Sequence, residues 1–101
     1  MFIYNVTTHV HHTIHKQWLQ WMQEKHIPNV MATECFSKHQ FVRVLETDET
    51  EGVTYAIQYF AESKALYNRY IEKFATTLRK ETTDKWGNQI IAFRSLMQVV
   101  N

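Results

Sequence analysis

Residues 47–60 of the chain, TDETEGVTYAIQYF, join a polar turn to a run of alternating character. Residues 47–52 are polar or glycine, whereas Val53 to Phe60 are rich in aromatic and β-branched side chains. This combination is typical of a hairpin connection followed by a strand. Residues 36–47 alternate as well, so the two segments together predict an antiparallel pair of strands.

A strand and a helix precede this hairpin. Residues 2–10 alternate between apolar and polar side chains, which predicts a strand. Residues 12–26 change to a helical period. We expect this helix to end at His26-Ile27, because Pro28 disfavours helical geometry in the residue before it. Pro28 is also suited to open a separate short helical turn through Met31.

A helix and a strand also follow the hairpin. Ser63 is a favourable N-cap for a long helix over residues 64–86, and Gly87 is a natural C-cap. Residues 89–100 alternate again and predict the last strand.

The predicted order is therefore βαββαβ, in one domain over residues 1–101. With right-handed crossovers, two interleaved βαβ units form a four-stranded antiparallel sheet with both helices on one face, a ferredoxin-like α+β sandwich. The other face then lacks a cover, and pairing with a second copy would bury it. We therefore expect a homodimer through the sheet face.

The two sets of alternating positions differ in character. One set is almost wholly apolar and is expected to face the helices: Tyr4, Val6, Val42, Val44, Val53, Tyr55, Ile57, Ile91 and Phe93. The other set is mixed and is expected to face the partner subunit: Asn5, Thr7, His39, Phe41, Arg43, Thr54, Gln58, Arg94 and Leu96.

Two interpretations of the polar groups in the mixed set stay open. In the first, Asn5, Arg43, Gln58 and Arg94 converge in a cavity and bind a small polar or anionic ligand, since guanidinium groups suit carboxylates and phosphates. In the second, the arginines pair with acidic residues such as Glu46 across the dimer or reach solvent.

Three further residues are candidates for a ligand site. His26 follows the first helical segment, where the helix dipole stabilises a cation; it is also suited to general acid–base work. Trp21 and Tyr55 are suited either to the core or to a pocket wall, and a buried tyrosine hydroxyl needs a partner.

The remaining motifs favour no chemistry. His9, His11, His12 and His15 fall within seven residues, but no nearby carboxylate or cysteine completes a metal site. Cys35 lacks a CxxC spacing and is expected to be structural. With two glycines, the chain has neither a phosphate-binding loop nor a nucleophile elbow. We expect neither a metal nor a cofactor.

Composition bounds the partners. The net charge is +1, so the chain has no charged field to recruit nucleic acid or anionic lipid. A single cysteine excludes an internal disulfide, and neither a signal peptide nor an apolar span is visible. We therefore expect a cytoplasmic protein without nucleic-acid or membrane partners.

Six segments together resemble a small bacterial family common in the Bacteroidetes, the domain-of-unknown-function family DUF4286. They are residues 3–7 (IYNVT), 18–22 (WLQWM), 26–33 (HIPNVMAT), 43–45 (RVL), 52–59 (GVTYAIQY) and 92–94 (AFR). The fold and the Trp…His…Pro pattern are more distantly similar to the dimeric α/β-barrel superfamily, which includes antibiotic-biosynthesis-type monooxygenases and EthD-like proteins.

This resemblance implies a barrel made of two four-stranded sheets, with pockets between sheet and helices. Transferred by position, it implies His26 and the Asn5/Arg94 pair as pocket groups. A shared fold transfers no reaction, so three hypotheses stay open. The first is a homodimeric small-molecule-binding module. The second is a cofactorless monooxygenase- or isomerase-like enzyme for an aromatic or quinone-like substrate. The third is a structural or regulatory subunit bound through the edge strand 36–47.

Overall fold

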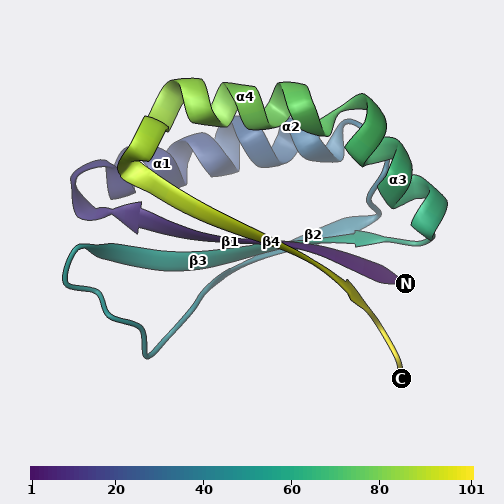
Figure 1. Cartoon of the computed structure of the whole chain (residues 1–101), viewed down its shortest axis with the longest axis horizontal. Coiled ribbons are helices and arrows are strands. Elements are labelled where there is room, and N and C mark those ends of the chain that lie inside the picture. The colour runs from purple at the N-terminus through teal and green to yellow at the C-terminus, as the bar shows by residue number, and fades with distance from the viewer.

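Four antiparallel strands form one sheet, and all the helices lie on one side of it (Figure 1). The computed structural model describes all residues, 1–101. The strands are β1 (Phe2–His11), β2 (Lys38–Arg43), β3 (Gly52–Ala61) and β4 (Ile90–Gln98), in the spatial order β2-β3-β1-β4. The predicted ferredoxin-like βαββαβ fold is confirmed.

The helical layer is more divided than the sequence pattern predicts. Its segments are α1 (His15–Trp21), a π-helical turn (Met22–His26), α2 (Ile27–Met31), α3 (Lys64–Lys73) and α4 (Ala75–Trp86). Short 3₁₀ turns precede α1 (His12–Ile14) and follow α4 (Gly87–Gln89). No helix is long and apolar enough to cross a membrane.

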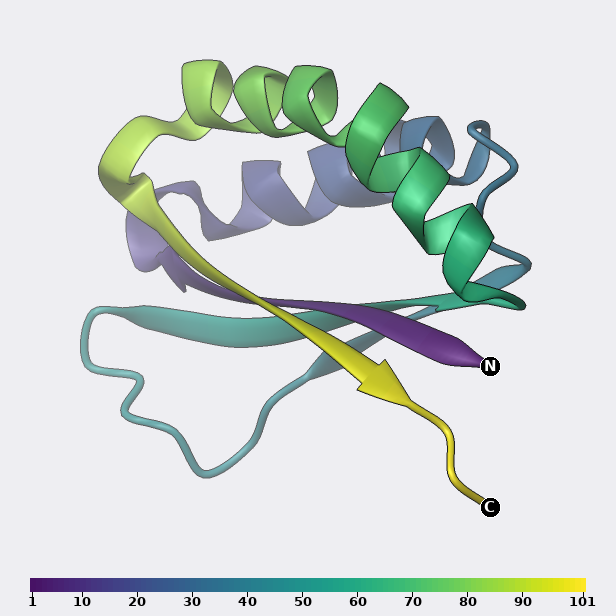
Figure 2. The same cartoon turned by 45° about the vertical axis from the view of Figure 1, so that its right-hand side comes forward.

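The predicted end of the first helix is wrong. The chain continues helically through Pro28 to Met31, because a π-helical turn before the proline absorbs its steric demand. The predicted helix over residues 64–86 is broken at Phe74, whose φ of −126° is not helical. Figure 2 shows the resulting bend between α3 and α4.

The caps of the second helical segment agree with the prediction. The Ser63 hydroxyl accepts a hydrogen bond from the Leu66 backbone N–H at 3.2 Å. Gly87 ends α4 with a φ of +57°, a value that side chains disfavour.

The predicted assignment of sheet faces is correct for β1 and β3 but wrong for β2 and β4. Phe41 and Arg43 pair with Ile57 and Tyr55, so they face the helices, and Val42 faces away. The two alternating sets of β2 are about equally apolar, so alternation could not decide its phase.

On β4 the error has a different cause. Arg94 pairs with Val6, which places it on the helix side, whereas Phe93 faces away from the helices. The more apolar set of this edge strand therefore points outward and stays exposed, with Phe93 66% accessible to solvent. Alternation predicts burial only where one face alone is apolar.

The core lies between sheet and helices. Tyr4, Phe36, Tyr59 and Tyr70 form an aromatic cluster in it, with ring centroids 5.0 to 6.1 Å apart. Trp18, Val10 and Val30 are also fully buried. This cluster forms one end of the cavity described next.

Candidate functional site

A cavity lies between the helical layer and the sheet. Its walls come from β1, β3, β4, α3, α4 and the segment Trp18–His26, and its volume is about 40 Å³. A space of this size holds roughly three water molecules or one small ligand group. Three of its polar lining residues are accessible to solvent: Arg94 is exposed, and Arg79 and Thr82 are half-buried.

The π-helical turn places His26 in this cavity. The Ile27 N–H donates to the Met22 carbonyl, a bond that spans five residues. In a regular helix Pro28 would meet the Glu24 carbonyl, but it has no N–H to donate and its ring would collide there. The wider turn relieves this conflict, and such turns are frequent at functional sites.

The imidazole of His26 is held between an aromatic ring and a cation. Trp21 stacks on it with ring centroids 4.9 Å apart and planes 23° from parallel. Burial, reinforced by the positive charge of Arg94, lowers the pKa of His26 from 6.5 to about 4. The predicted role as a cation at a helix end is therefore wrong, because the helix continues and the imidazole is neutral at pH 7.

Four buried polar atoms without a hydrogen-bond partner belong to residues that line this one cavity. They are Trp18 Nε1, His26 Nδ1, Tyr59 Oη and Arg79 Nε. Burial also raises the pKa of the Tyr59 hydroxyl, which therefore stays protonated. Unpaired buried polar groups are costly, so four residues that carry such atoms around one space favour a water or ligand there.

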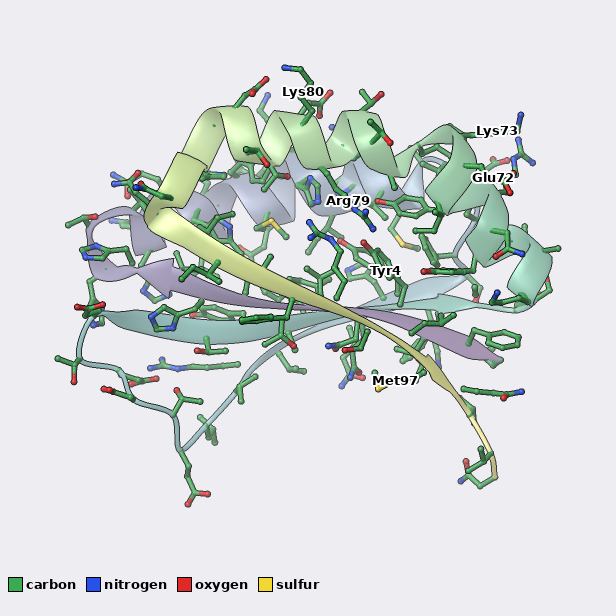
Figure 3. The ribbon with its side chains drawn as sticks, in the orientation of Figure 1. Tyr4, Glu72, Lys73, Arg79, Lys80 and Met97 are labelled. Carbon is green, nitrogen blue, oxygen red and sulfur yellow. The ribbon has the colours of Figure 1, made fainter.

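Two guanidinium groups line the same cavity. Arg79 Nη2 donates to the Tyr4 hydroxyl at 2.9 Å, and Figure 3 shows the two side chains meeting between α4 and the sheet. Arg94 reaches the cavity from β4. No acidic residue lines the cavity, and neither arginine forms a salt bridge.

Only His26 and Arg94 of the seven residues predicted from the sequence line this cavity. Trp21 contacts it indirectly, through its stack on His26. Asn5 and Gln58 are cross-strand neighbours on the opposite face of the sheet, where Asn5 Nδ2 donates to Thr7 Oγ1 at 3.0 Å. The proposed convergence of Asn5 and Gln58 with the two arginines is therefore wrong.

Tyr55 and Arg43 face the helices but lie outside the cavity. The Tyr55 hydroxyl is 2.7 Å from His15 Nε2, and its ring packs on Trp18 and Phe41. Arg43 forms a salt bridge of 2.8 Å with Glu49 of the same chain, and not with Glu46. These contacts satisfy both side chains.

The clustered histidines point to different partners. His9 contacts Thr54, His11 contacts Thr13, and His12 contacts the Glu49 carbonyl. No group of three or more His, Cys, Asp or Glu side chains is placed to hold a metal ion. Cys35 is buried, with Sγ 3.7 Å from the Thr33 carbonyl.

Four cavity residues are absent from the predicted site: the pattern favours the core for Trp18 and Tyr59 without excluding a pocket wall, and Arg79 and Thr82 carry no prediction. One signal was available for two of them. Arg79 and Thr82 lie one and four positions after Leu78, on the same stripe of α4 that continues to the buried Trp86. Polar side chains within an apolar stripe mark a place where the helix faces something other than core.

The same fold occurs in several solved structures. A dimeric ferredoxin-like protein from an uncultured marine organism is 14% identical and has a TM-score of 0.76, over 99% of this chain and 95% of that one. An EthD family protein from Bacillus halodurans is 9% identical with a TM-score of 0.69, over 99% and 100%. SnoaB, a cofactor-independent oxygenase from Streptomyces nogalater, is 8% identical with a TM-score of 0.63, over 99% and 94%.

At such identities the likeness concerns the fold and not the chemistry. Comparison with the curated proteins gives no match. The family model described as a domain of unknown function matches residues 1–100. The chain therefore belongs to the DUF4286 family, as the resemblance of its segments predicted.

Proposed function

We propose that the protein is a homodimeric small-molecule-binding module, with one ligand site per protomer in the cavity between sheet and helices. The observation that carries this proposal is that four residues lining one space, Trp18, His26, Tyr59 and Arg79, each hold a buried polar atom without a hydrogen-bond partner. Binding pockets combine apolar walls with a few convergent polar groups, which is the composition of this cavity.

The outer sheet face supports the dimer. Ile91, Phe93 and Met97 all lie on it and remain 37 to 66% exposed. Figure 3 shows Met97 on the side of the sheet opposite the helices. A sheet face this apolar suits a self-complementary contact, in which the same patch meets its copy. The neighbours described as dimeric ferredoxin-like proteins are consistent with this arrangement.

Two adjacent threonines of α4 provide a matched test of the ligand site. Thr82 lines the cavity, whereas Thr83 is exposed to solvent. We expect Thr82→Phe to fill the cavity and to abolish binding of small aromatic probes such as benzamide, measured by NMR titration. Thr83→Phe should bind as the wild type does. Equal binding by both variants, or no binding of any probe by the wild type, would overturn the ligand site.

The dimer is tested by light scattering. The wild type should have about twice the chain mass of 12.1 kDa. Phe93→Asp places a charge on the outer sheet face and should return the protein to the mass of one chain. Ala65→Asp, an exposed position on α3, adds the same charge on the helix side and should leave the dimer intact. A wild type of one chain mass at micromolar concentration would reject the dimer.

One observation favours a second candidate, a cofactorless enzyme that begins by proton abstraction. His26 is neutral and carries an unpartnered Nδ1 beside the cationic Arg94. A neutral imidazole can accept a proton from a carbon acid, and a nearby guanidinium stabilises the resulting enolate. Hydrogen–deuterium exchange at the central carbon of acetylacetone tests this step. Exchange that is undiminished in His26→Gln would remove the enzyme from consideration.

A further inference from the structure

We propose that the ligand of this cavity is a small organic carboxylate whose charged group lies between Arg79 and Arg94. This inference rests on the proposed binding function and specifies its ligand class. It depends on the charges that line the cavity, on the hydrogen bonds that Arg79 does and does not make, and on the state of His26.

The charges around the cavity are unbalanced. Two guanidinium groups line it, and no carboxylate does. Elsewhere in the chain two cations form salt bridges with acidic residues, Arg43 with Glu49 and Lys80 with Asp84. Two cations that share a partly buried space repel each other, and an anion between them removes that repulsion. The cavity therefore selects for negative charge.

The side chain of Arg79 is oriented in advance. Its Nη2 is fixed by the Tyr4 hydroxyl at 2.9 Å, while its Nε is buried and donates to nothing. An Nε–H together with a neighbouring guanidinium N–H forms the edge that binds a carboxylate through two parallel hydrogen bonds. The Tyr4 contact thus holds the guanidinium while leaving a donor available.

The other polar groups complete a site for an anion. The Tyr59 hydroxyl stays protonated, and the Trp18 indole N–H can only donate, so both can donate hydrogen bonds to an acceptor. His26 is neutral, so it adds no competing charge of its own at neutral pH. The aromatic rings of Tyr4, Tyr70 and Trp18 form flat walls beside these donors.

The size of the space limits the ligand. A volume of about 40 Å³ accommodates a carboxylate with a short substituent. A ring-sized substituent requires Arg94 to move outward, and Arg94 is exposed at the cavity mouth. The experiment therefore uses two sizes of ligand, acetate and benzoate, each paired with its uncharged amide of nearly the same shape.

We would titrate the four compounds into the protein and follow the indole N–H signal of Trp18 by NMR. Benzoate or acetate should bind at least about tenfold more tightly than benzamide or acetamide, because a charge-assisted hydrogen bond is worth about 1.5–3 kcal/mol and 1.4 kcal/mol is tenfold. For ligands this small, affinities on the order of millimolar are expected. Phosphate and chloride form a separate arm of the titration.

Arg79→Gln and Arg94→Gln should each weaken carboxylate binding about tenfold and leave amide binding within about twofold. Arg69→Gln, at an exposed position on α3, is the matched control and should change neither. Arg94 is itself exposed, so its variant keeps the test open if Arg79→Gln fails to fold.

The outcomes separate this inference from the function on which it rests. Equal affinity for acid and amide, with binding still blocked by Thr82→Phe, would overturn the carboxylate and leave the binding module intact. Phosphate or chloride binding as tightly as the carboxylates would reduce the site to an unselective anion site and would also overturn it. Binding of none of the compounds would overturn the binding module itself.

Discussion

Trp21 stacks on the imidazole of His26, with ring centroids 4.9 Å apart and an angle of 23° between the planes. The indole shields one face of the imidazole from water, while the other side of His26 lines the cavity. Adjacent turns of a regular helix bring residues three or four positions apart together. The π-helical turn between Trp21 and His26 widens this spacing to five.

Because His26 is buried, the free energy of unfolding depends on pH. The pKa of His26 is about 4 in the folded protein, against an ordinary value of 6.5. Between these pH values the unfolded chain binds a proton that the folded chain excludes. The stability that comes from keeping His26 neutral is therefore fully present above pH 6.5. It is lost as the pH drops toward 4, by roughly 3 kcal/mol at most. Urea unfolding at pH 7, 6, 5 and about 4.5 should show this loss.

His26→Gln should remove most of this slope. His15 leaves a smaller one of the same sign, because burial, with the nearby positive charge of Arg43, lowers its pKa as well. His39→Gln, on an exposed side chain of β2, is the control and should keep the full slope. An unchanged slope in His26→Gln would contradict the assignment of a buried, neutral imidazole.

Removing the stacked indole should raise the pKa of His26. Trp21→Ala admits water to the imidazole, so the main cause of the depression weakens and the pKa should move from about 4 toward 6.5. Arg94→Gln should move it in the same direction by removing a like charge. NMR titration of the imidazole Cε1–H measures both. Trp21→Phe keeps an aromatic ring in place and should shift the pKa less; a larger shift than in Trp21→Ala would argue against shielding.

The sequence predicts this fold well because alternation and helical period depend on local spacing. Its failures lie where two requirements act on one segment. Pro28 ends a helix by its own geometry, but the five-residue turn before it lets the helix continue. The alternation predicts the exposed Phe93 as a core residue, because an apolar outer face of a sheet gives the same sequence pattern as the face that packs against the helices.

The candidate site is less accessible from the sequence. Its groups come from β1, β3, β4, α3, α4 and the helix before Pro28, and no spacing along the chain links them. The alternating pattern predicts that Arg94 and Asn5 share a sheet face, because both lie in the set of strand positions with mixed polar and apolar character. The register of β1 with β4 puts them on opposite faces. A one-residue change of phase reverses every side chain of a strand, so a site prediction is only as good as the register.

The hydrogen bond from Arg79 to Tyr4 should contribute measurably to stability. Tyr4→Phe removes the acceptor and leaves a second N–H of Arg79 without a partner, which should cost about 1–3 kcal/mol. Tyr67→Phe is the control, since Tyr67 packs against Tyr4 with ring centroids 5.8 Å apart but lies nearer the surface. In a double-mutant cycle with Arg79→Gln, a coupling energy near zero would show that the bond does not persist in solution.

The two glycines should respond differently to alanine, for different physical reasons. At Gly52 a Cβ would lie 2.1 Å from the backbone oxygen of Val10, so β1 and β3 would have to separate locally. At Gly87 nothing lies within 4 Å, and the obstacle is only the φ of +57°. Backbone strain of this kind costs about 1–3 kcal/mol, whereas a clash with main-chain atoms of the neighbouring strand should cost more.

Urea unfolding at one fixed protein concentration measures both variants, because the stability of a dimer depends on concentration. We expect Gly52→Ala to lose more stability than Gly87→Ala, together with protection of amide hydrogens along β1. Gly87→Asn is a further control, since asparagine tolerates positive φ better than alanine, and it should recover part of the loss. A Gly52→Ala variant as stable as Gly87→Ala would mean that the close approach of β1 and β3 at Val10 is looser than its geometry indicates.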